Sequence, residues 1–188
     1  MDQDDLDRIA KCNDGDMEAC AALYEQYKLL VFHTALLIVG DREDAEDILQ
    51  DVFMAVFRSL STYDPAKGAF STWIHQITVN RCLNYKRGEN AFRWLGVRLG
   101  LMGNPVRSPY LIAENRDWMR QALYRLNKPL RAVLVLRYYH NLSYQEIAQI
   151  LRISLGTVKS RLYQAHKCLE KMLVVEGCYE PENSEGLP

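Results

Sequence analysis

Residues 142–170 read LSYQEIAQILRISLGTVKSRLYQAHKCLE, and they contain the start signals of two helices separated by a tight turn. Ser143 precedes Glu146 by three residues, the spacing of a capping box, in which the serine caps the helix and the glutamate reaches back to the serine backbone. Ser154 is placed to cap a second helix. The stretch therefore predicts two short helices in succession.

The second of these helices has two distinct faces. Apolar residues recur at helical spacing and predict one buried stripe: Val158, Leu162, Ala165, Leu169 and Met172. The other side is polar and basic, with Thr157, Lys159, Ser160, Arg161, Tyr163, Gln164 and Lys167. A helix-turn-helix presents such a face to the DNA major groove. The alternative is a helical hairpin with a solvated face. We favour the helix-turn-helix because two caps, a short turn and a basic face coincide.

Charge is segregated along the chain, although the net charge of the 188 residues is only −1. Residues 1–66 contain 15 acidic and 5 basic side chains, whereas residues 67–114 contain 2 and 7, and residues 115–173 contain 3 and 11. The last 15 residues are acidic again, with 4 acids and no base. This asymmetry indicates an acidic, protein-facing first part and basic, nucleic-acid-facing later parts.

Upstream of the helix-turn-helix, the periodic segments all have helical spacing, so we expect an all-α fold. Glu18–Val39 predicts one helix or two in succession, and Gly40-Asp41 ends it. Arg42–Leu60 and Phe70–Lys86 predict two more helices, with Pro65 and Gly68 marking the loop between them. Residues 89–114 are rich in glycine and proline and predict a linker with a short helix near 91–99, whereas residues 174–188 predict an acidic, disordered tail.

Two further surfaces have unusual composition. The Arg42–Leu60 helix carries, opposite its apolar stripe, a polar stripe that suits a partner protein: Asp47, Gln50, Asp51, Met54 and Arg58. The Phe70–Lys86 helix interleaves Trp73 with amides and bases. Aromatic rings stack on exposed nucleobases and basic groups hold phosphates, so this pattern fits single-stranded nucleic acid. The alternative, in which the apolar members of this helix are simply core, is expected to hold for Ile74 and Ile77.

We do not expect this protein to be an enzyme. The four histidines lie in separate segments, no phosphate-binding glycine loop or nucleophile motif occurs, and the carboxylates of Glu43–Asp51 spread over more than one helical face. The five cysteines lack zinc-like spacing, so we expect reduced thiols, no metal and no cofactor. Leu29–Val39 is too short to span a bilayer, and the acidic N-terminus is unlike a signal peptide, which predicts a soluble, cytoplasmic protein without membrane insertion.

In this order the motifs GDREDAEDILQDVFMAVFRSL, FSTWIHQITVNRCLNYKR and LSYQEIAQILRISLGTVKSRLYQAHKCLE resemble the extracytoplasmic-function (group IV) sigma factors of bacterial RNA polymerase. The resemblance implies two small helical domains: residues 1–88 as sigma region 2, a linker at 89–114, residues 115–173 as sigma region 4, and the tail at 174–188. It implies promoter-specific initiation of transcription with core RNA polymerase, and regulation by an anti-sigma factor that covers both promoter-binding surfaces.

The resemblance also implies roles for individual residues. Core polymerase binding is implied for Asp47, Gln50, Asp51, Phe53 and Arg58. Contact with the melted, single-stranded −10 element is implied for Asp64, Lys67, Phe70, Ser71, Trp73, Gln76, Asn80, Arg81, Asn84, Lys86 and Arg87. Contact with the duplex −35 element is implied for Thr157, Lys159, Ser160, Arg161, Tyr163, Gln164 and Lys167. Many relatives carry arginine where this chain has Gln164, so we expect a different −35 preference, because arginine suits guanine and glutamine suits adenine.

Competing interpretations remain at this point. An autonomous helix-turn-helix repressor would bind duplex DNA as a dimer, but it needs neither the stripe on Arg42–Leu60 nor the aromatic helix. A metal-dependent enzyme would use the carboxylates of Glu43–Asp51. A sigma-like regulator with degraded promoter contacts is a further alternative, against which the intact motifs argue.

Overall fold

The computed structural model describes residues 3–85 and 121–175, and the described part of the chain is helical with no strand. The first domain contains α1 (Gln3–Asn13), α2 (Met17–Val39), α3 (Arg42–Ser59), the short 3-10 turns η1 (Leu60–Thr62) and η2 (Pro65–Lys67), and α4 (Phe70–Asn84). The second contains a helical turn at residues 121–125, α7 (Lys128–Leu134), the π-helical turn η3 (Val135–Tyr139), α8 (Tyr144–Leu151) and α9 (Leu155–Val175). The predicted all-α architecture is confirmed over these residues.

Side-chain caps set most helix boundaries where the sequence predicts them. Asp16 accepts from the backbone N–H groups of Glu18 and Ala19, and Asp41 caps α3 in the same way. Between them, Gly40 ends α2 in the left-handed conformation with φ 89°, and its N–H donates to the Leu36 carbonyl. The predicted break at Gly40-Asp41 is therefore present, and α2 is a single continuous helix.

The helix-turn-helix is built as its capping signals predict. Ser143 and Glu146 form both bonds of the capping box at the start of α8. Arg152 ends α8 with a left-handed φ of 52°, and Ser154 then accepts from the Thr157 N–H at 3.1 Å. The expected stripe on α9 points inward: Val158, Leu162 and Ala165 are buried, and Leu169 and Met172 pack at its edge.

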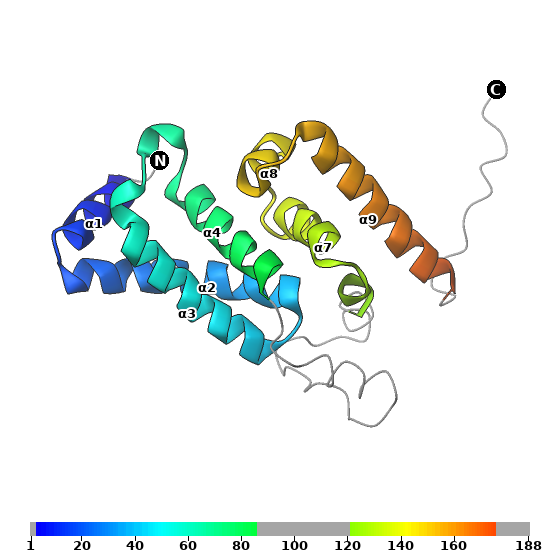
Figure 1. The fold of residues 1–188 in the computed structure, drawn as a ribbon, viewed down its shortest axis with the longest axis horizontal. Coiled ribbons are helices and arrows are strands. Elements are labelled where there is room, and N and C mark those ends of the chain that lie inside the picture. The colour runs from blue at the N-terminus through cyan, green and yellow to red at the C-terminus, as the bar shows by residue number, and fades with distance from the viewer. Residues whose placement is uncertain (1–2, 86–120, 176–188) are drawn as a thin grey trace.

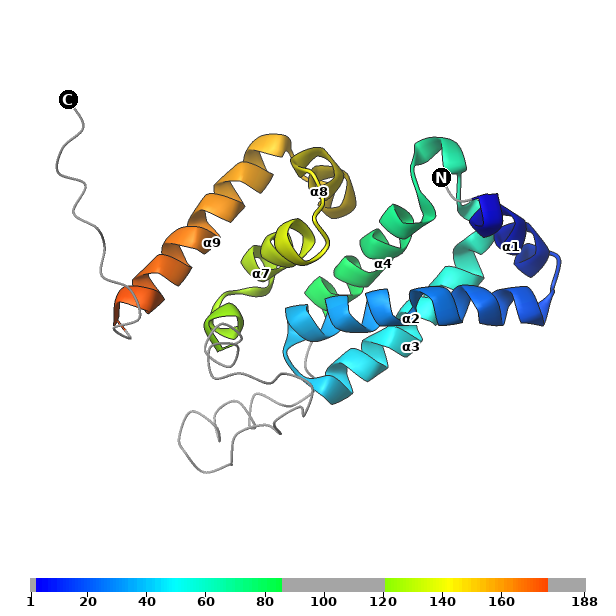
Figure 2. The same ribbon diagram turned by 180° about the vertical axis from the view of Figure 1, so that it is seen from behind.

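The two domains lie side by side and share one continuous core (Figures 1 and 2). Helix α4 of the first domain contacts α7 and α8 of the second, and α2 contacts α7 and η3. The second domain therefore covers one flank of the first. The predicted linker, the predicted short helix near 91–99 and the predicted acidic tail lie outside the described residues.

Helix α1 is the main element that the sequence analysis did not predict. Its signals are short: acids at Asp4 and Asp5 in the first turn, Lys11 in the last, and an apolar Leu6 and Ile9 spaced by three. The structure also joins Cys12 of α1 to Cys20 of α2 in a disulfide, with the Cα atoms 5.0 Å apart. The expectation of uniformly reduced thiols is wrong for this pair, because the tight turn between the helices brings the two cysteines together; Cys82 and Cys168 are free.

Candidate nucleic-acid interface and protein-docking face

The first turns of α9 present the predicted duplex-reading residues. Lys159, Ser160, Tyr163, Gln164 and Lys167 are exposed, and Thr157 and Arg161 are half-buried. Tyr163 is 62% exposed, and the Lys167 ammonium lies 5.5 Å from its ring centroid. Because the opposite stripe of α9 is packed in the core, this face is held outward and is free to enter a groove of DNA.

Two of the predicted contacts on α9 also have a local structural role. The Thr157 hydroxyl lies 2.8 Å from that of Ser154, and the Ser160 hydroxyl donates to the Thr157 carbonyl. Both side chains therefore help to order the helix start. No comparable hydrogen bond among the described residues at the start of α9 involves the side chains of Lys159, Arg161 or Gln164. These three are therefore the better candidates for reading base edges.

The loop between α3 and α4 is ordered by its own side chains. Asp64 accepts from the Ala66 N–H at 3.0 Å and pairs with the Lys67 ammonium at 3.2 Å. These hydrogen bonds hold the pKa of the Asp64 carboxyl below its usual value. The Tyr63 hydroxyl donates to the Gly68 carbonyl at 3.0 Å, which closes the loop from the other side. The loop is thus preorganised rather than loose.

Two hollows flank this loop. The first, of about 300 Å³, lies between the loop and helices α1 and α2, with a wall formed by Asp5, Leu6, Gln26, Tyr27, Tyr63, Ala69, Phe70 and Ser71. The second, of about 360 Å³, is lined by Thr62, Tyr63, Asp64, Lys67, Gly68, Ala69, Thr72, Trp73 and Gln76 of the first domain and by Gln149, Ile150 and Arg152 of the second. Both volumes are in the range of small-ligand sites.

Helix α4 places the remaining single-strand candidates at different depths. Asn80, Arg81 and Asn84 are exposed along its outer side, whereas Trp73 and Gln76 are half-buried at the second hollow. Phe70 is only 3% exposed, because its ring packs among Tyr27, Tyr63 and Trp73. The Phe70 ring therefore lines the first hollow and is not exposed for stacking on a nucleobase. Lys86 and Arg87 lie outside the described residues.

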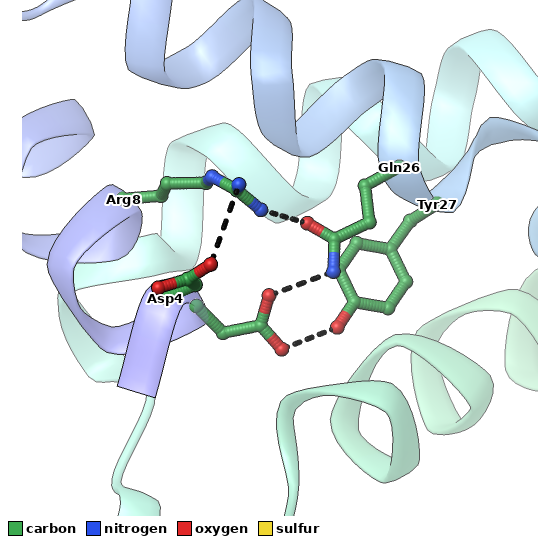
Figure 3. A network of polar contacts seen from close by, with 5 residues as sticks. Asp4, Arg8, Gln26 and Tyr27 are labelled. Atoms are coloured by element: carbon green, nitrogen blue, oxygen red, sulfur yellow. Dashed lines mark hydrogen bonds and ion pairs between the residues drawn. The ribbon is translucent and has the colours of Figure 1, made fainter. Parts of the chain in front are cut away.

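Helix α1 supports the loop region through a compact polar network (Figure 3). The buried Asp5 carboxylate accepts from the Gln26 amide at 2.9 Å and from the Tyr27 hydroxyl at 2.6 Å. Arg8 donates to the Gln26 amide oxygen at 2.5 Å and lies 3.9 Å from Asp4. Since Asp5, Gln26 and Tyr27 line the first hollow, α1 contributes directly to a wall that the sequence analysis did not attribute to it.

The outer face of α3 carries the predicted protein-docking stripe. Asp47, Gln50, Asp51 and Arg58 are exposed, together with Met54 at 57% and Phe57 at 37%. Phe53 is an exception: it is 4% exposed and packs against Tyr24 with ring centroids 4.7 Å apart. At this position the helix therefore faces the core, and Phe57 supplies the exposed aromatic ring. The polymerase contact that the resemblance implies for Phe53 stays a prediction.

One end of the stripe is tied to the next helix. The Tyr85 hydroxyl donates to the carboxylates of Asp44 and Asp47 at 3.4 and 3.3 Å. Burial and these two carboxylates raise the pKa of Tyr85 to about 12. Asp47 is thereby oriented by α4, so the stripe has fixed geometry at this end.

Among the described residues there is neither a cluster of metal-binding side chains nor a membrane-spanning helix. No group of three or more His, Cys, Asp or Glu side chains among them is arranged to hold a metal ion. None of the described helices has the length and apolar content needed to cross a membrane.

Known proteins share both the domain order and the fold of this chain. The family description "Sigma-70 region 2" matches residues 23–92, and "Sigma-70, region 4" matches residues 116–169. The ECF RNA polymerase sigma factor SigW of Bacillus subtilis is 26% identical over 88% of this chain and 95% of its own length. SigE of Mycolicibacterium smegmatis is 33% identical over 80% of this chain and 60% of its own length.

Solved structures agree on the fold. The structure of CnrH in complex with the cytosolic domain of CnrY matches with a TM-score of 0.66 at 22% identity, covering 93% of this chain and 99% of the other. The sigma factor RpoE of Bartonella quintana, in complex with the anti-sigma factor NepR, matches with a TM-score of 0.58 at 23% identity, covering 81% and 98%. The chain belongs to the sigma-70 family of transcription initiation factors, in its extracytoplasmic-function branch.

Proposed function

We propose that this protein is an alternative sigma factor that directs bacterial core RNA polymerase to specific promoters. The observation that supports the proposal is the presence, on one chain, of an exposed polar and basic face on α9, suited to duplex DNA, and of a separate aromatic and basic surface suited to single strands. A repressor that binds only duplex DNA has no use for the second surface. The proposed activity is binding alone, with no chemical step of its own, and it takes place where the polymerase acts, in the cytoplasm.

In this proposal each domain has its own task. Residues 115–173 position the polymerase by inserting the exposed face of α9 into the major groove at the −35 element. Residues 1–88 hold the melted −10 strand along α4 and the loop from Asp64 to Phe70. Because the melted strand is bound and the duplex form is not, binding energy shifts the equilibrium toward open DNA.

Polymerase docking is proposed for the stripe on α3, with Asp47, Gln50, Asp51 and Arg58 as polar contacts and Met54 and Phe57 as apolar ones. Exposed apolar side chains rimmed by charges are typical of interfaces. The structural relatives held in complexes with CnrY and with the anti-sigma factor NepR support a further partner of the same kind, an anti-sigma factor.

Reconstituted transcription tests the proposal. Core polymerase would be combined with this protein and a library of promoter DNA, and the start sites would be sequenced. We expect initiation that depends on the protein and shared motifs near −35 and −10. If core polymerase neither binds the protein nor initiates, the proposal fails and an autonomous duplex-binding repressor becomes the leading account.

A charge reversal separates polymerase docking from promoter reading. Asp51→Lys reverses an exposed charge in the α3 stripe. It is expected to weaken core polymerase binding at least tenfold, since mispaired interface charges cost several kcal/mol. Lys171→Glu reverses an exposed charge on α9 outside the proposed contacts and serves as the control. Both variants should keep the unfolding free energy of the native protein and its affinity for −35 duplex DNA.

A further inference from the structure

Two cysteines form a bridge at the point where α1 meets α2. The disulfide joins Cys12, in the last turn of α1, to Cys20, in the first turn of α2, and the Cα atoms are 5.0 Å apart. Both residues are half-buried, and residues 13–16, which form the turn between the helices, are exposed. A small thiol or disulfide in solution can therefore reach the bridge.

The bridge is unusual for the compartment in which the proposed function places the protein. Reducing systems keep cytoplasmic cysteines as thiols, and the disulfides that do form there are usually transient and redox-sensing. Among the described residues, Cys82 and Cys168 are free thiols. Burial raises the pKa of the Cys82 thiol to about 12, so little of its reactive thiolate is present at neutral pH. The half-buried pair is therefore the better candidate for reversible thiol chemistry.

Helix α1 depends on support from outside itself, because it has only 11 residues. Isolated helices of fewer than about 12–15 residues are marginal in water. The bridge holds α1 at its C-terminal end. Near the other end, the Asp5 carboxylate is 8% exposed and accepts from the Gln26 amide and the Tyr27 hydroxyl (Figure 3). Opening the bridge therefore leaves α1 attached mainly through its N-terminal half.

Asp5 connects α1 to the loop between α3 and α4. Asp5, Tyr63 and Phe70 line the same hollow of about 300 Å³, and α1 also contacts η1, which leads into the loop. Burial, and next the Asp5 carboxylate, raise the pKa of the Tyr63 hydroxyl, so these two groups are close enough to interact. The same hydroxyl donates to the Gly68 carbonyl at 3.0 Å and closes the loop. The position of α1 therefore affects both the hollow and the loop.

We infer that Cys12 and Cys20 form a reversible redox switch, in which the disulfide state binds the melted −10 strand more tightly than the dithiol state. The inference rests on the proposed function, since it needs the strand-binding role of the loop and α4. With the bridge closed, α1 keeps the loop region preorganised, and a preorganised site loses less entropy on binding. With the bridge open, α1 detaches for part of the time, and apparent affinity falls with the fraction of ordered protein.

The proposed oxidant is a small disulfide of the glutathione class. One cysteine thiolate attacks a sulfur of glutathione disulfide, which forms a mixed disulfide and releases one glutathione. The thiolate of the other cysteine attacks the protein sulfur of that mixed disulfide, which closes the bridge and releases the second glutathione. Two electrons pass from the dithiol to glutathione disulfide, and the two thiol protons end on the two glutathione molecules. Excess glutathione reverses both steps.

A redox titration is the first test. The variant Cys168→Ser/Cys178→Ser keeps the pair and removes two other thiols, and Cys12→Ser/Cys20→Ser in the same background is the control without the switch. Each full-length protein is incubated at defined ratios of glutathione to glutathione disulfide, its thiols are alkylated, and its mass is measured. We expect the pair to change reversibly between two alkylated thiols and one bridge as the ratio changes. A pair that stays in one state at every ratio overturns the inference.

Strand binding is the second test. The oxidised and the reduced protein are freed of reagent and combined with core polymerase. The probe is a fluorescent single-stranded oligonucleotide with the non-template −10 sequence of a promoter from the reconstituted reaction. The oxidised protein should bind it about threefold or more tightly than the reduced protein, because the apparent dissociation constant depends on the ordered fraction. The control without the switch should show no difference between the two treatments, and affinity for −35 duplex should be the same in both states.

The outcomes separate the inference from the function on which it rests. Equal strand affinity in the two redox states overturns the inference. If the protein still supports initiation at specific promoters in that case, the proposed function stands. If core polymerase with the protein initiates in neither state, the proposed function has failed and the inference fails with it.

Discussion

At the scale of single residues, Gly40 matters both for the backbone conformation that ends α2 and for the close approach of the second domain. Its φ of 89° disfavours any side chain, and a Cβ atom there would lie 3.1 Å from the Tyr124 ring of the second domain. Gly15 has a similar φ of 94°, but open space surrounds its Cβ position. Comparing alanine substitutions at the two glycines therefore distinguishes the cost of backbone strain from the cost of steric crowding between the domains.

We predict that Gly40→Ala lowers the free energy of unfolding by about 2–3 kcal/mol and Gly15→Ala by only about 1 kcal/mol, since strain acts at both positions and crowding only at the first. Urea denaturation of the two variants beside the wild type measures this. Equal losses for both would mean that Tyr124 moves aside at little cost and that the close approach is unimportant.

Gln164 is the residue at which base preference is expected to depart from the relatives. It is exposed on the reading face of α9, and a glutamine suits adenine whereas an arginine suits guanine. We predict that Gln164→Arg shifts preference toward guanine at one −35 position by about 1–3 kcal/mol of discrimination. Binding to duplexes with single base changes measures the shift. If Gln164→Ala leaves every base preference unchanged, Gln164 does not read the sequence.

At the scale of elements, α4 contacts the residue that follows η3 through two neutral histidines, His75 and His140. Burial, and next the nearby His140, lower the pKa of His75 to about 3; burial, and next His33, lower that of His140 to about 4. Among the described side chains, His75 Nδ1 is a buried nitrogen without a hydrogen bond. A proton placed on either ring would add an unsolvated charge.

Unfolding restores a pKa near 6.5, so below pH 6.5 the unfolded chain binds more protons than the folded protein, and stability rises with pH. We predict a loss of about 2 kcal/mol from the buried His75 between pH 7 and pH 5, and a smaller loss from His140, which is partly exposed and therefore partly solvated when charged. Urea unfolding of wild type and of His75→Gln/His140→Gln at both pH values measures it, with His166→Gln, exposed on α9, as control. A double variant that keeps the full pH dependence would assign the effect to other groups.

Helix α1 depends on its link to α2. The bridge between Cys12 and Cys20 restricts the unfolded chain, and a loop of this length is worth about 2.5 kcal/mol in the chain-entropy description. We predict that the variant Cys12→Ser/Cys20→Ser loses about this much unfolding free energy and that the amide hydrogens of α1 exchange faster in it. The control variant Cys168→Ser, at a free cysteine, should show neither change. Dithiothreitol should reproduce the effect in the wild type alone. Unchanged exchange in α1 would show that the Asp5 network holds the helix by itself.

At the scale of the whole molecule, opposite net charges on the two domains favour the contact between them. Residues 1–88 carry 15 acids against 9 bases, and residues 115–173 carry 11 bases against 3 acids. Salt screens such long-range attraction, with a Debye length that falls from about 10 Å at 0.1 M to about 3 Å at 1 M. We predict that scattering from the wild type shows a larger radius of gyration at 1 M than at 0.1 M sodium chloride. A radius insensitive to salt would attribute the contact between the domains to the shared apolar core and the hydrogen bonds rather than to net charge.

Much of the fold follows from local patterns. The capping box at Ser143, the cap at Ser154 and the break at Gly40-Asp41 involve residues within one helical turn, so adjacent sequence is sufficient to predict them. The buried stripe of α9 follows from its 3.6-residue period. The same reasoning located the exposed polar and basic face of α9 and the exposed polar stripe on α3.

Other features depend on contacts between distant segments. Phe70 matches the aromatic motif around it, yet it is buried, because its depth depends on the Tyr27–Tyr63 cluster. Helix α1 was not predicted, since its periodic pattern is only one turn long and its support comes from Gln26 and Tyr27. Short periodicity is a weak signal, and tertiary contacts supply the rest of the stability.

The sequence by itself determined the helices, their caps and the exposed faces of α9 and α3, because those features depend on neighbouring residues and a fixed period. Only the tertiary structure decided that α8 lies against the loop between α3 and α4 and that Lys128 and Arg131 cap helices of the other domain. Those contacts join Lys128 to Cys82 and Arg131 to Ile38, 46 and 93 positions apart in the chain. The acceptors are backbone carbonyls, which every residue carries, so no side-chain pattern in the sequence marks the place where the domains meet.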